Sequence, residues 1–113
     1  MSKPKRIILK EEFFEITGDT IEAMILNYLF EETQKEENKD GLAISIPRLT
    51  DKMLFNISWA TVRNRLISLS KKEFITVNDV FKNKNYKIMS YKTNNEIIDR
   101  EMMKRGYRLF GYK

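Results

Sequence analysis

The sequence contains no cysteine and no histidine among its 113 residues. Without cysteine the chain can form neither a disulfide framework nor a thiolate metal site. Without histidine it lacks the commonest general base and the commonest metal ligand. Only four glycines are present, and they form no glycine-rich phosphate-binding loop. We therefore expect no cofactor and no metal, and an enzyme relying on carboxylates or lysines alone is the least favoured class of function.

Long apolar runs are also missing. No stretch approaches the roughly 20 residues that a transmembrane helix needs. The apolar run at 7–9 is too short for the core of a signal peptide. We therefore expect a cytoplasmic protein without a membrane partner. The length and an apolar content of 42% suit one domain, covering residues 1–113, with one modest core.

Charge is distributed unevenly along the chain. Residues 1–41 hold six Lys or Arg against ten Asp or Glu, a net charge of −4. Residues 42–81 hold six against three, and residues 82–113 hold nine against three. The positive charge therefore lies in the C-terminal two thirds. Such an asymmetry favours a surface that faces nucleic acid, although an ordinary solvated basic surface would give the same counts.

Apolar periodicity and capping residues predict a mostly α structure with a small β-hairpin. A helix begins at Asp19 or Thr20, where Asp19 and Glu22 have the spacing of a capping box. Its predicted buried stripe is Ile21, Met24, Ile25, Tyr28 and Leu29. A short strand is predicted at 42–44, a helix-turn-helix at 47–71 and a hairpin at 74–91. A last helix is predicted at 94–105. Asn94 or Asn95 caps it, and Gly106 follows it.

A short helix joined by a tight turn to a second helix is a helix-turn-helix, and the hairpin after it has the place of a wing. The second helix of such a unit enters the major groove with short polar side chains near its N-terminus. Its arginines can hold flanking phosphates, and wing lysines can follow the backbone. The candidate DNA-binding residues are Ser58, Ala60, Thr61, Arg63, Asn64, Arg65, Ser68, Lys71, Lys82, Lys84 and Lys87.

Each of these residues also has a structural interpretation. Ser58 is a good helix N-cap whatever the function. Arg63, Arg65 and the wing lysines can simply be solvated. Trp59 is expected on the core side of its helix, where it would pack rather than stack on a base. The aromatic tail at 107–113 is expected to pack or to dimerise.

Two stretches of the chain resemble known families. One is similar to the winged helix-turn-helix superfamily, in which a leucine-threonine element precedes S-x2-T-V-R-x2-L-x2-L and K-G-hydrophobic-I. Here Leu49-Thr50 precedes residues 58–69 and 72–75, and Glu73 stands where the glycine often occurs. The other stretch, residues 13–27, resembles the "E-F-x-E-L-T-G-D-x3-A-x-I-L-N" opening of Firmicutes phage and plasmid replication-initiator or replisome-organiser proteins.

The resemblance implies a sequence-specific double-stranded DNA-binding protein of a mobile element. Replication initiation and transcriptional regulation both remain open as its role. The alternative is a winged helix used as a protein–protein interaction module without DNA binding. Because one winged helix covers little DNA, we expect a homodimer through the N-terminal helix or through the C-terminal helix and tail. Replication proteins are candidate further partners.

Overall fold

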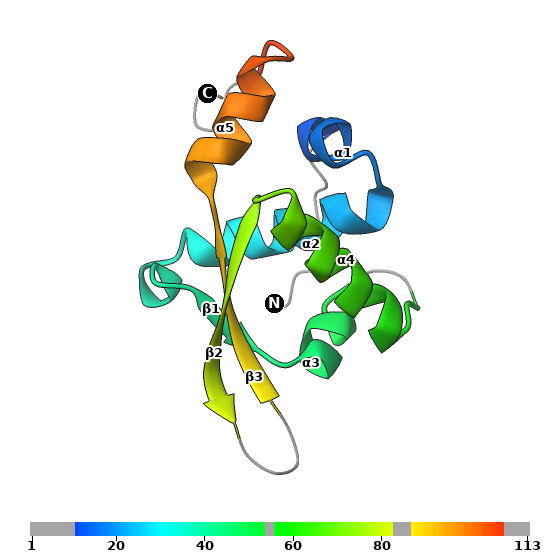
Figure 1. The fold of residues 1–113 in the computed structure, drawn as a ribbon, viewed down its shortest axis with the longest axis vertical. Coiled ribbons are helices and arrows are strands. Elements are labelled where there is room, and N and C mark those ends of the chain that lie inside the picture. The colour runs from blue at the N-terminus through cyan, green and yellow to red at the C-terminus, as the bar shows by residue number, and fades with distance from the viewer. Residues whose placement is uncertain (1–10, 54–55, 83–86, 108–113) are drawn as a thin grey trace, which may run out of the picture.

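A computed structural model describes residues 11–53, 56–82 and 87–107 (Figure 1). The elements follow in the order α1 Glu11–Thr17, α2 Thr20–Thr33, the 3-10 helix η1 Glu36–Asn38, β1 Leu42–Ile44, α3 Ile46–Asp51, α4 Trp59–Lys71, β2 Ile75–Lys82, β3 Lys87–Thr93 and α5 Asn95–Met103. The expected mostly helical α+β class is confirmed. None of the helices described is long and apolar enough to cross a membrane.

The centre of the core is α2. Asp19 caps it, since Glu22 N donates to Asp19 Oδ2 at 2.9 Å. The predicted stripe was only partly right: Met24, Ile25 and Leu29 are buried, whereas Ile21 and Tyr28 are half-buried. Ala23, Leu26 and Asn27 are buried as well. The reason is that α1, α4 and β3 all pack around this helix, so that little of its circumference meets water. Only half of the predicted capping box forms, because the Glu22 carboxylate turns to a lysine at the C-terminal end of α4 instead.

The strands form one antiparallel sheet in the order β1–β3–β2. The predicted hairpin is confirmed, with its strands at 75–82 and 87–93, paired from Ile75↔Thr93 to Lys82↔Lys87. The short strand β1 pairs with the other edge of β3, with Ala43 opposite Ser90. In Figure 1 the hairpin runs away from α5 toward the end of the molecule where α3 lies.

The turn from α4 into β2 is a Schellman motif. Phe74 N donates to Leu69 O and Glu73 N donates to Ser70 O, each at 3.0 Å. Glu73 has a φ of 67°, the left-handed region where glycine is normally found. The winged-helix pattern that this stretch resembles often has glycine at this position, where this chain has a glutamate.

The last helix begins where expected but is capped differently. Asn94 is at the N-cap position without a side-chain capping bond. Its side chain instead accepts from Thr76 Oγ1 at 2.9 Å and donates to Glu73 O at 2.7 Å. Ile98 and Met102 are buried, whereas Met103 is 52% exposed. Residues 108–113 of the aromatic tail lie outside the described residues.

Candidate nucleic-acid interface

The N-terminus of α4 is a solvent-facing helix end. Ser58 is its N-cap, as predicted, and Ser58 Oγ accepts from Thr61 N at 3.1 Å. The two hydroxyl oxygens of Ser58 and Thr61 lie 2.9 Å apart. Val62, Leu66 and Leu69 are buried and fix the inner side of the helix. The first turn is therefore held rigidly while Ser58 and Ala60 remain exposed and Thr61 half-buried.

The outward side of α4 is basic and polar. Arg63, Asn64 and Lys71 are exposed, and Ser68 is half-buried. The helix contains no acidic residue. Within the described part of the chain, neither Arg63 nor Lys71 forms an ion pair, so both cations are available to an anion from outside.

Arg65 is different from its neighbour Arg63. Its Nε lies 3.4 Å from Asp19 Oδ2, and its Nη1 lies 3.9 Å from Glu22 Oε2. Its side chain is 38% exposed. Arg65 therefore faces the carboxylates of α2, and the predicted phosphate contact would have to compete with them.

The hairpin lysines are described only in part. Lys82 and Lys87 are cross-strand partners at the far end of the paired region, and nothing of their side chains is described. Lys84 lies outside the described residues. The register nevertheless brings two positions of the predicted basic wing directly opposite each other.

The expectation for Trp59 is wrong. Its side chain is 61% exposed, because the first turn of α4 projects beyond the core that Val62 and Leu66 reach. Ile67, two turns further along, is 47% exposed. Trp59, Arg63 and Ile67 follow at i, i+4 and i+8, a spacing that places them on one side of a helix. The sequence spacing did not reveal this, because Trp59 also precedes the buried Val62 and Leu66 at i, i+3 and i+7, which is the spacing of one helix face.

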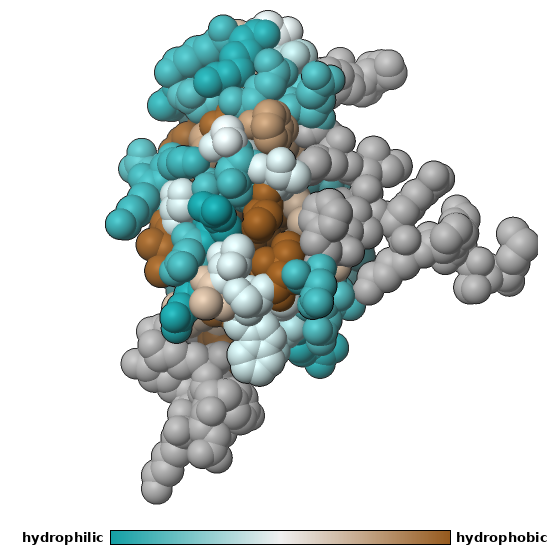
Figure 2. Space-filling view, turned by 90° about the vertical axis from the view of Figure 1, so that its right-hand side faces the viewer, coloured by the Kyte–Doolittle hydropathy of each residue, from teal (hydrophilic) through white to brown (hydrophobic). Residues whose placement is uncertain are grey.

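This side of α4 forms one wall of a groove. The groove has a volume of about 1170 Å³ and lies between α4, the start of α3 and the face of the sheet. The residues facing it from the sheet and α3 include Pro47, Val77, Ile88 and Met89. Figure 2, which views the molecule from the side of α1 and α4, shows hydrophobic residues at mid-height of an otherwise largely hydrophilic face.

Titratable and metal-binding chemistry is sparse here. Tyr91 lines the groove, and its burial raises its pKa above the ordinary value, so that it stays a neutral phenol. No cluster of three carboxylates suited to a metal ion occurs in the parts of the chain that are described.

Comparisons with protein-family models, with curated proteins and with solved structures give no match for this chain.

Proposed function

We propose that the chain is a winged helix-turn-helix protein that binds double-stranded DNA, with α4 in the major groove and the β2–β3 hairpin on the adjacent backbone. The order of elements supports this: α3 and α4 form the helix-turn-helix, and the hairpin follows α4 directly. The observation that carries the proposal is the outward side of α4. It combines a capped, exposed N-terminus with exposed cations and has no acidic residue.

Each part of this face has a distinct task in the proposal. The first N–H groups of α4 and the Ser58 hydroxyl suit a phosphate. Asn64, exposed in the second turn, can pair with the major-groove edge of adenine. Arg63 and Lys71 would hold phosphates on either side, and Lys82, Lys84 and Lys87 would extend the contact along the hairpin. A role in replication initiation or in transcriptional regulation rests on the family resemblance.

A second copy of the chain would complete the DNA contact. α1 packs against α5, and each carries an exposed apolar residue, Phe14 at 43% and Met103 at 52%. These two helices are the surfaces expected from the sequence to dimerise. Two copies joined there would bind half-sites separated by about one turn of DNA, roughly 34–36 Å. Sedimentation showing only monomer at high protein concentration would overturn the dimer.

The experiment that tests DNA binding is fluorescence anisotropy with a labelled random duplex at several salt concentrations. The wild-type affinity should fall steeply with salt, because each phosphate contact releases a counterion. A plot of log K against log salt concentration should be less steep for Arg63→Ala, by about one unit of slope, because one phosphate contact is lost. Arg65 is unsuited to this test, since its removal also breaks the ion pairs with α2.

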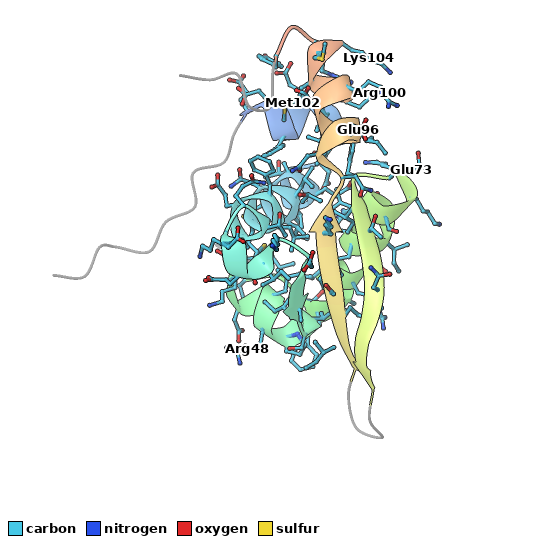
Figure 3. The ribbon with its side chains drawn as sticks, turned by 90° about the vertical axis from the view of Figure 1, so that its left-hand side faces the viewer. Arg48, Glu73, Glu96, Arg100, Met102 and Lys104 are labelled. Atoms are coloured by element: carbon cyan, nitrogen blue, oxygen red, sulfur yellow. The ribbon has the colours of Figure 1, made fainter. Side chains whose placement is uncertain are left out.

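Arg100 offers the matched control. It is exposed on α5, at the opposite end of the molecule from Arg48 on α3 (Figure 3). Arg100→Ala removes the same charge as Arg63→Ala and should leave the salt slope unchanged. Absence of duplex binding at low salt, or equal losses from the two variants, would overturn the proposed function.

A further inference from the structure

The groove between α4 and the sheet is chemically unlike a DNA-binding surface. Its walls are largely apolar side chains: Trp59 and Ile67 from α4, Pro47 from α3, and Val77, Ile88 and Met89 from the sheet. A phosphate placed against these side chains would lose water without gaining hydrogen-bond donors, which is unfavourable. The groove therefore requires an occupant that is itself partly apolar.

The charges of the groove restrict the occupant further. Among the described residues that line it, the charged ones are Arg63 and Lys71, and both are cations. They lie on α4 two turns apart, and neither has an ion-pair partner in the described part of the chain. An occupant that fits the groove combines apolar side chains for its floor with carboxylates for these two positions.

We propose that this groove is a docking site for a short acidic, amphipathic peptide segment of a partner protein, which binds as a helix. The α4 wall is 13 residues long, about 20 Å, and can accommodate roughly twelve helical residues. Helices bind in such grooves through apolar anchors at i, i+3 or i+4, and i+7. Partly exposed Trp59 and Ile67 are then the residues that the peptide covers. This site stands on the groove alone and does not require the proposed DNA binding.

The test is a selection from a library of displayed random 12-residue peptides on the full chain. The selection is counter-screened against the Ile67→Ser variant, which should fold because nearly half of Ile67 is exposed. Ala43→Ser is the control, since it places the same serine at an exposed position of β1 that does not line the groove and takes no part in the proposed DNA or dimer contacts. Enriched peptides should carry apolar residues at helical spacing and a net negative charge.

Binding of a synthesised, tryptophan-free peptide can be followed directly. Trp59 is the single tryptophan of the chain, so a shift of its emission to shorter wavelength reports that the groove is covered. Ile67→Ser should weaken binding of the peptide about tenfold or more, whereas Ala43→Ser should leave its affinity unchanged. Arg63→Glu/Lys71→Glu should also weaken an acidic peptide.

Three results would overturn the proposal. One is a selection that yields no peptide able to distinguish the wild-type chain from Ile67→Ser, or that yields basic peptides. Another is a measurement in which Ile67→Ser lowers the affinity for a 20-base-pair duplex as much as Arg63→Ala does. That result would assign the groove to nucleic acid. The third is a finding that the wild-type chain is a dimer and that Ile67→Ser makes it monomeric. That result would assign the groove to a second copy of the chain.

Discussion

Lys72 Nζ lies 2.8 Å from Glu22 Oε1, joining the C-terminal end of α4 to the first turn of α2. The same ammonium donates to Thr17 O at 2.9 Å, and Arg65 approaches Glu22 from the middle of α4. The Glu22 side chain is only 4% exposed. The position of α4 is therefore set by a buried carboxylate as well as by the apolar packing of its inner side.

Replacing that carboxylate should destabilise the fold. Glu22→Gln keeps the shape but removes the charge that Lys72 and Arg65 share, so the free energy of unfolding should fall by about 1–2 kcal/mol. Urea denaturation measures the change. Glu96→Gln, at an exposed position of α5, is the control and should stay within about 0.5 kcal/mol of the wild type. A loss in Glu22→Gln no greater than in the control would show that apolar packing alone holds α4.

The turn after α4 should gain from a glycine. Glu73 has a φ of 67°, a conformation that costs a residue with a Cβ about 1–2 kcal/mol. Glycine avoids this cost but loses about 0.5–1 kcal/mol through the entropy of the unfolded chain. Glu73→Gly should therefore raise the free energy of unfolding by about 0.5–1 kcal/mol, seen as a higher urea midpoint at unchanged m value. Glu73→Ala, which keeps the Cβ, should show no gain. If both variants raise the free energy of unfolding equally, the gain comes from removing the carboxylate and not from relieving the backbone conformation.

Tyr107 should titrate unusually high. Its hydrogen bond to Glu15, together with partial burial and the charge of that carboxylate, raises the pKa of Tyr107 to about 12. In an unfolded chain the phenol titrates near 10. The bond therefore stabilises the fold fully below about pH 10, and its contribution is lost as the pH rises toward 12.

Ultraviolet titration of the phenols measures this pKa. Tyr107→Phe should remove a step near pH 12 from the curve of the five tyrosines, and Glu15→Gln should shift that step downward. Glu31→Gln, at an exposed position of α2, is the control and should leave it in place. A curve for Tyr107→Phe that differs from the wild type only near pH 10 would contradict the assigned bond.

Local signals in the sequence were reliable for the helices that position the site. Asp19 and Ser58 cap their helices as predicted, and Met24, Ile25 and Leu29 of the predicted stripe are buried. These features depend on residues close together in the chain. The hairpin was predictable for the same reason, since turn residues separate two strand-like runs.

Features that depend on docking between distant elements were not predictable. The pairing of Arg65 with Asp19 needs the packing of α4 on α2, which no local pattern encodes. The exposure of Trp59 follows from where the core ends relative to the first turn of α4. The groove needs the sheet face and α4 to be placed together. The sequence therefore predicted the candidate DNA-binding face but not the apolar groove beside it.

If the proposed DNA face and the proposed peptide groove are both correct, their ligands should compete. Arg63 and Lys71 belong to both, and a carboxylate bound to either cation leaves it unavailable to a phosphate. Adding the selected acidic peptide to a complex with labelled duplex should therefore lower the anisotropy to that of free DNA. With Ile67→Ser the same peptide should release DNA only at about tenfold higher concentration, because its apolar anchor is lost while the DNA face is intact. A rise in anisotropy would instead mean that the peptide and the duplex bind at once. Arg63 and Lys71 could not then contact both ligands.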